Sequence, residues 1–286
     1  MLDQDLLDWT SANYEAIAVA AEIGPDAPIP SCPGWTMNEL LSHASNTING
    51  WFAYNAAREP DDLGVGSGLR SAPPEPEEWA ARVAHLRAGA RAFADLVHAT
   101  DLDRPVWTFD LPMGRARFWL LRAATESAIH RWDAEGVVGG QTKMPADLAA
   151  ASVDETLRGL WRFVYRQTTG GGRGLVASIT IPRPPASLGI HATDSRARWL
   201  LQADATERSY EVISDGAMPE TVVSGEGHEL VLFLWGRNGT LAPTGELGPN
   251  GLPAYPGATV RNARGLAVSG DADLVDAWNF GVHSEM

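Results

Sequence analysis

The stretch Arg117–Glu135, RFWLLRAATESAIHRWDAE, decides the fold of the N-terminal part of the chain. As an α-helix of about 3.6 residues per turn, it places polar side chains roughly one turn apart along a single stripe. The stripe consists of Arg122, Glu126, His130 and Asp133. Because much of the remaining helix surface is apolar, this stripe is either a solvated face or a buried functional site.

Two members of the stripe have the spacing of metal ligands. Glu126 and His130 are four residues apart, which places their Cβ atoms about 5–6 Å from each other on a helix. A carboxylate and an imidazole at that spacing can share one divalent ion at about 2.0–2.2 Å per bond. Such pairs are also common in proteins without a metal, so a site requires a third ligand from elsewhere in the chain.

The segment Ser31–Phe52, SCPGWTMNELLSHASNTINGWF, offers a candidate for this third ligand. Thr36 and Glu39 form a capping box after a Pro-Gly turn, which predicts the start of a helix. His43 falls on the apolar side of that helix and is expected to face inward. A lone inward histidine is usually a satisfied core residue. Joined to the Glu-His pair, however, it gives two imidazoles and one carboxylate, a set found in catalytic zinc sites and in related iron sites.

The motifs in both segments resemble the mycothiol-dependent maleylpyruvate isomerase family. SCPGWT followed by ELLSH, and later ESAIHRWDAE, occur in the order found in the N-terminal domain of that family. This domain is a DinB-like, metal-binding four-helix bundle. The resemblance implies a divalent metal, with Zn²⁺ favoured, held by His43, Glu126 and His130. It also implies that Asp133 lies beside the metal as an orienting or acid/base catalytic group.

The rest of the N-terminal half has the periodicity of a helical bundle. Apolar residues recur at helical spacing over 2–22, 36–57 and 77–99. With the helix at 117–135 they predict an antiparallel four-helix bundle whose interior holds the candidate site.

A further helix is predicted over 146–167, followed by the glycine-rich stretch TTGGGRG at 168–174. This stretch neither follows a strand nor opens a helix, so we interpret it as a linker rather than a phosphate-binding loop. The chain is therefore predicted to contain two domains, 1–168 and 175–286.

After residue 175 the apolar period shortens toward two, which predicts strands. The predicted strands are 175–181, 187–193, 197–203, 210–214 and 265–271. Helices are predicted at 228–237 and 272–280, which makes this a smaller α+β domain. The order of elements, with the phrases LWGR and SGD, resembles the sterol-carrier-like C-terminal domain of the same family. The segment Asn238–Arg264 departs from it, because it is longer than the family's turn, and long loops are often functional.

Composition excludes several classes of function. The 286-residue chain has a formal net charge of −14, which argues against nucleic acid or an anionic membrane as a partner. Cys32 is the only cysteine, so it forms no internal disulfide, and we expect any reactive thiol to come from another molecule. The acidic N-terminus is unlike a signal peptide, and no long apolar run is present. We expect a cytoplasmic protein and keep a homodimer open.

The leading hypothesis is an enzyme that uses mycothiol as a cosubstrate, of the maleylpyruvate isomerase type. Its partners would be this small-molecule thiol and a small electrophilic substrate. The resemblance implies that Arg237, in the LWGR phrase, binds a substrate carboxylate. Arg58, at the end of the second predicted helix, is a second candidate for ligand binding, with a surface salt bridge as the alternative.

Two other functions are compatible with the same residues. The first is a mycothiol S-transferase that acts on a different electrophile or on a biosynthetic intermediate, because the motifs indicate the thiol and metal better than the acceptor. The second is a non-catalytic protein that holds an apolar ligand in the sterol-carrier-like domain.

Overall fold

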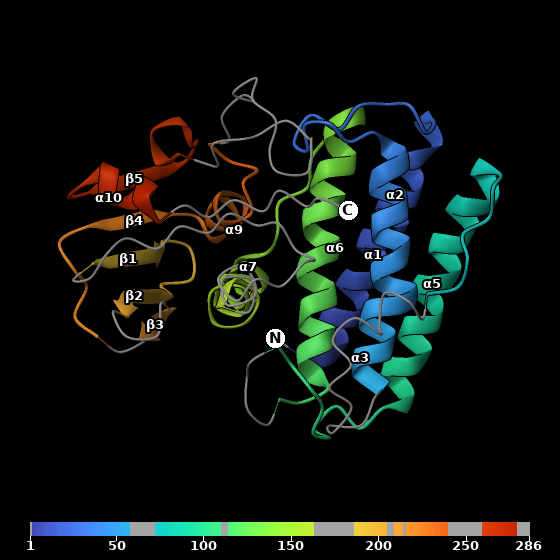
Figure 1. Cartoon of the computed structure of the whole chain (residues 1–286), viewed down its shortest axis with the longest axis horizontal. Helices are drawn as coiled ribbons and strands as arrows, with labels where there is room; N and C mark the ends of the chain where they lie inside the picture. Colours follow the sequence, from blue (N-terminus) through green and yellow to red (C-terminus); the bar gives the residue numbers. More distant parts are fainter. Residues whose placement is uncertain are drawn as a thin grey trace. The chain divides into compact units, whose positions relative to one another are not determined.

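The computed structural model of the chain describes residues 2–57, 72–109, 114–162, 186–204, 209–213, 216–239 and 259–278. The chain folds as two compact units, Met1–Lys143 and Met144–Met286. The first unit is helical and the second combines helices with a mixed sheet (Figure 1). This arrangement confirms the predicted fold class. The predicted linker at 168–174 lies outside the described residues.

Four helical rods make up the described part of the first unit. They are α1 (Asp3–Ala20), the run from α2 (Met37–Asn46) to α3 (Ala53–Ala57), α5 (Trp79–Ala99) and α6 (Arg117–Val138). Figure 1 shows the rods alongside one another, and α1 packs against both α5 and α6. Helix α2 also packs against α5 and α6, so α2 and α6 face each other across the bundle interior.

The rod that carries α2 is continuous, as predicted, but it widens into a π-helical segment at Thr47–Phe52. Side chains in and beside this segment bond to the backbone one turn earlier: Asn49 Nδ2 donates to the Ser45 carbonyl (3.0 Å) and Asn55 Nδ2 to the Trp51 carbonyl (2.7 Å). Gly89 of α5 allows the close approach here, because a Cβ at that position would lie 2.3 Å from the Asn49 side chain.

The second unit begins with α7 (Ala146–Glu155), which continues as a π-helical turn at Thr156–Leu160. Its five described strands are β1 (Ser187–Ala192), β2 (Arg198–Asp204), β3 (Ser209–Ile213), β4 (Val222–Gly225) and β5 (Leu266–Ser269). They are ordered β3-β2-β1-β4-β5, and only the β1–β4 pair is parallel.

The helices of the second unit lie close to the predicted positions. Helix α9 (Gly227–Leu234) packs on α7, and α10 (Ala272–Ala277) follows β5. Three of the predicted strands correspond to β1, β2 and β3, and a fourth to β5. The predicted strand at 175–181 lies outside the described residues, and β4 was not predicted as a strand.

The ends of the long segment Asn238–Arg264 are tied together. The Asn238 side chain donates to the Arg264 carbonyl (2.8 Å) and accepts from the Arg264 backbone N–H (2.7 Å). The segment therefore begins and ends at one point of the fold. Residues 240–258 lie outside the described residues.

No helix among the described residues is both long enough and apolar enough to cross a membrane.

The capping box that opens α2 provides a test of the fold. The Thr36 side chain accepts from the Asn38 backbone N–H (3.2 Å), and the Glu39 carboxylate accepts from the Thr36 backbone N–H (2.8 Å). Burial alone would raise the pKa of Glu39, but the hydrogen bonds from Thr36 outweigh it and lower this pKa below its usual 4.5. The stabilisation is therefore present above pH 4.5 and is lost as the pH falls through the lowered value.

We expect Thr36→Ala to reduce the free energy of unfolding by about 0.5–2 kcal/mol at neutral pH. Glu39→Gln should also be destabilising at neutral pH, and its difference from the parent should shrink in acid, as measured by denaturant unfolding at several pH values. Glu77→Gln removes an exposed carboxylate and serves as the control. A Glu39→Gln deficit that is independent of pH would contradict the assigned cap.

Candidate metal centre

The polar stripe of α6 is buried. The exposed fractions are 2% for Arg122, 8% for Glu126, 3% for His130 and 0% for Asp133. Burying ionisable side chains is costly unless each is paired, so a helix retains such a stripe only where partners meet it. The burial excludes a solvated face and leaves a buried functional site as the interpretation of the stripe.

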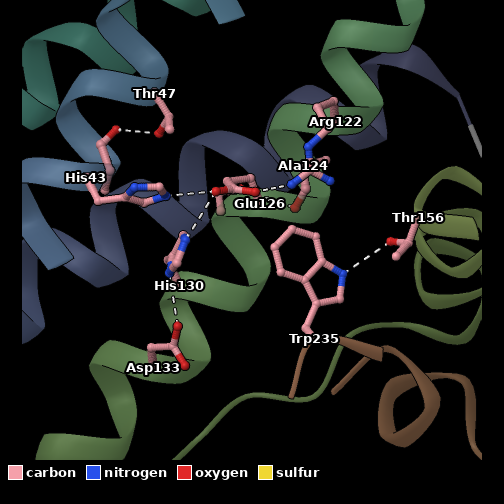
Figure 2. Close-up of polar contacts among 11 residues, drawn as sticks. His43, Thr47, Arg122, Ala124, Glu126, His130, Asp133, Thr156 and Trp235 are labelled. Carbon is pink, nitrogen blue, oxygen red and sulfur yellow. Dashed lines mark hydrogen bonds and ion pairs between the residues drawn. The ribbon is translucent and has the colours of Figure 1, made fainter. Parts of the chain in front are cut away.

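His43 reaches this stripe from α2. Its Nε2 atom lies 2.9 Å from Glu126 Oε1, and Nε2 of His130 lies 3.2 Å from the same oxygen. Figure 2 shows both imidazoles pointing at this carboxylate from two helices. The two rings are edge to face with centroids 4.7 Å apart. One ligand atom from each of the three side chains lies within 4.8 Å of the others, and this is the one such group within the described part of the chain.

The hydrogen bond on the far side of His130 fixes which nitrogen faces the centre. Nδ1 of His130 lies 2.9 Å from Asp133 Oδ2. A carboxylate oxygen accepts, so Nδ1 carries a proton. In the neutral ring Nε2 then presents its lone pair toward Glu126, whereas in the charged ring both nitrogens carry protons. A lone pair facing a carboxylate oxygen is stable only if a proton or a metal cation lies between them. The donor set therefore fits a divalent ion, and two imidazoles with a carboxylate suit zinc or iron.

The electrostatics of the cluster keep Glu126 in its ionised form, which is the form that binds a metal. Burial alone would raise the pKa of Glu126, but the Arg122 guanidinium and the two imidazoles outweigh it and hold this pKa well below its usual 4.5. Arg122 pairs with the other carboxylate oxygen, Oε2. Burial alone would lower the pKa of His130, but Asp133 and Glu126 raise it. Glu126 is thus ionised. One of its oxygens is paired with Arg122, and the other faces the two imidazoles.

Helix α1 contributes a residue that the sequence did not single out. Tyr14 is 1% exposed, and burial together with the nearby Glu126 charge raises the pKa of its hydroxyl. The hydroxyl therefore stays neutral in the bundle interior. An aromatic residue at helical spacing is typical of a core position, so no sequence pattern distinguished it.

The turn before α2 supplies two further contacts. Ser31 Oγ donates to Asp133 Oδ1 (2.6 Å), and the Trp35 indole is nearly parallel to the His130 ring, with centroids 6.2 Å apart and an angle of 14°. Ser31 and Trp35 both belong to the SCPGWT motif, but no role was predicted for either, since contacts between distant segments leave no periodic signal. Cys32 is buried and is not one of the three converging groups.

Neither candidate arginine belongs to the described part of the first unit. Arg58 lies outside the described residues. Arg237 belongs to the second unit, shortly beyond the end of α9, where its guanidinium donates to the Trp235 carbonyl (2.7 Å). The roles of both stay predictions.

Comparison with known proteins agrees with the resemblance recognised in the sequence. Residues 6–135 match a family model described as the Mycothiol maleylpyruvate isomerase N-terminal domain. A solved structure of a mutant mycothiol-dependent maleylpyruvate isomerase shares the fold at a TM-score of 0.51, with 13% identity, over 89% of this chain and 93% of that chain. A second structure of that isomerase has a TM-score of 0.46 and 15% identity, over 88% and 94% of the two chains. No curated protein matches the chain.

We expect the purified protein to bind about one Zn²⁺ per chain and to be stabilised by it, by about 2.7 kcal/mol when free zinc is about 100 times the dissociation constant. His43→Ala should remove the binding and the shift in melting temperature, because one of three ligands is lost. The measurement is metal analysis together with thermal unfolding, with and without a chelator. His98→Ala, an exposed histidine in the last turn of α5, is the control. Undiminished zinc in His43→Ala would remove the assignment.

Proposed function

We propose, from the match of residues 6–135 to the mycothiol maleylpyruvate isomerase N-terminal domain, that this protein is a metal-dependent enzyme with mycothiol as its cosubstrate. The observation that carries the proposal is the convergence of His43, Glu126 and His130 from two helices on one point. A non-catalytic ligand-binding protein would have no need to bury these charged groups together.

The three converging residues would hold the ion, for which we favour Zn²⁺. A divalent ion bound there supplies one chemical effect: it lowers the pKa of a thiol, so that the thiolate is present at neutral pH. Two neighbouring side chains orient the residues that would bind the ion. Asp133 accepts from Nδ1 of His130 and keeps Nε2 directed inward. Arg122 neutralises the oxygen of Glu126 that faces away from the imidazoles, so the carboxylate keeps its orientation.

For the reaction itself we favour cis–trans isomerisation of a small unsaturated dicarboxylate. Such a substrate accepts a thiolate at one alkene carbon, and the electron pair of the double bond moves into the conjugated carbonyl. The former double bond then rotates as a single bond, and loss of the same thiolate restores the alkene in the trans form. Asp133 would shuttle a proton or orient His130 during these steps.

The alternative is an S-transferase that leaves the thiol on its electrophilic substrate. One observation supports keeping it: the family match covers residues 6–135, which carry the metal ligands, and the similarity over the rest of the chain is at the level of fold. The second unit, including the long segment from Asn238 to Arg264, can therefore serve a different acceptor.

We expect zinc-loaded protein to isomerise maleylpyruvate only in the presence of mycothiol. Asp133→Asn should lower kcat/KM by about 10- to 100-fold, because the orienting partner of His130 is weakened. Asp95→Asn, at an exposed carboxylate on α5, is the matched control. Formation of stable mycothiol conjugates with a panel of electrophiles, without isomerisation, would favour the S-transferase. No turnover in either assay would sink the enzymatic proposal.

For Arg237 we propose binding of a substrate carboxylate. We expect Arg237→Met to raise KM for the dicarboxylate by about tenfold or more, because a hydrogen bond to a charged group contributes about 1.5–3 kcal/mol. The zinc content should not change. Arg198→Met replaces an exposed arginine of β2 and is the control. Equal KM values for the two variants would remove Arg237 from the site.

A further inference from the structure

The Ser31–Asp133 hydrogen bond joins two segments that are 102 residues apart in sequence. The donor is the Ser31 hydroxyl in the turn before α2, and the acceptor is Oδ1 of a fully buried carboxylate on α6. At 2.6 Å it has the length typical of a charge-assisted O–H···O⁻ bond, which is stronger than a hydrogen bond between neutral groups.

The other oxygen of the same carboxylate holds a metal-ligand candidate. Oδ2 of Asp133 accepts from Nδ1 of His130 (2.9 Å), so the carboxylate is restrained at both oxygens. A carboxylate restrained at one oxygen can still turn about its χ2 angle, which is broad and nearly two-fold for aspartate. The Ser31 hydroxyl removes that freedom and thereby fixes the direction of the bond to His130.

The turn that carries Ser31 is itself well fixed. The Ile29 backbone N–H donates to the Trp35 carbonyl (2.9 Å), and the Trp35 N–H donates to the Cys32 carbonyl (2.9 Å). Gly34 adopts a φ of +91°, which favours glycine. Trp35, at the end of the turn, stacks along the His130 ring (Figure 2 shows this ring between Glu126 and Asp133). One short turn therefore restrains His130 through its hydrogen bond and through its ring face.

We propose that Ser31 is a positioning residue of the metal centre, which acts through Asp133 to hold Nε2 of His130 toward the ion. The proposal rests on the metal site proposed above. It differs from a merely structural role, in which Ser31 would stabilise the turn or satisfy a buried carboxylate without influencing the affinity for the ion.

The test is the Zn²⁺ affinity of the full-length protein, measured by competition with a chromophoric chelator. We expect Ser31→Ala to weaken zinc binding by about 10-fold, the lower end of the range for groups that support a ligand. Ser31→Thr keeps a hydroxyl and should restore most of the affinity. Ser31→Val has the shape of Ser31→Thr without the hydroxyl, so the two form a matched pair.

Two further variants separate positioning from general damage. Ser42→Ala removes another serine–carboxylate hydrogen bond, from Ser42 Oγ to Glu75 Oε1 (2.7 Å), beside His43 in sequence, and should keep the parent affinity. In an Asp133→Asn background Ser31→Ala should add little, because the intermediary is already impaired. Thermal unfolding of the metal-free proteins identifies the variants that are folded.

The outcomes distinguish this inference from the metal proposal. If the parent protein does not bind zinc, or if its zinc affinity equals that of His43→Ala, the metal site is overturned and this inference with it. A parent whose zinc affinity depends on His43, while Ser31→Ala and Ser31→Val match the parent, overturns this inference alone. An equal loss in the Asp133→Asn background and in the parent background would show that Ser31 does not act through Asp133, and would also overturn it.

Discussion

The arrangement depends on one buried negative charge, the carboxylate of Glu126. Removing a carboxylate from water costs several kcal/mol unless nearby positive or polar groups compensate it. Here Arg122 pairs with one oxygen and two imidazoles converge on the other. Because one imidazole comes from α2 and everything else from α6, the compensation of this charge also ties the two helices together.

A cation at this point would bind the Glu126 oxygen and the two imidazole nitrogens that face it. The hydrogen bond from Nδ1 to Asp133 directs Nε2 of His130 inward. The His43 ring lies edge to face with the His130 ring. Without a metal, protons must occupy these contacts, which agrees with the raised pKa of His130. Metal binding would displace such protons, so the same residues couple the affinity for the ion to pH. The bundle thus positions the side chains of the cluster, and the chemistry depends on the ion or proton that they bind.

Much of this could be predicted from the sequence, for identifiable reasons. The spacing of Glu126, His130 and Asp133 fixes a single helical face, so their proximity followed from helix geometry. His43 required more, because pairing between distant helices has no periodic signal. Its place on the apolar side of a predicted helix made it a candidate, the motif resemblance implied its role, and the structure brings it to Glu126. The proposal that these residues bind a metal follows from the chemistry of the donor set.

Other features could not be predicted, because they arise from tertiary contacts. The bond from Ser31 to Asp133 spans 102 residues, and a serine before a Pro-Gly turn looks like ordinary turn chemistry. The π-helical segment Thr47–Phe52 accompanies local side-chain bonds to the backbone, which a periodicity analysis does not register. The short strand β4 has no clear alternation of residue types in its sequence, VVSG, although it lies between β1 and β5 in the sheet.

The most direct measurement is an anomalous-difference map from a crystal of the protein soaked with Zn²⁺ and mycothiol, recorded at the zinc absorption edge. The account predicts a single strong peak within bonding distance of His43 Nε2, His130 Nε2 and a Glu126 oxygen, with the sulfur of mycothiol next to it. A map with no peak among these three side chains, or with zinc bound only elsewhere on the chain, would contradict it.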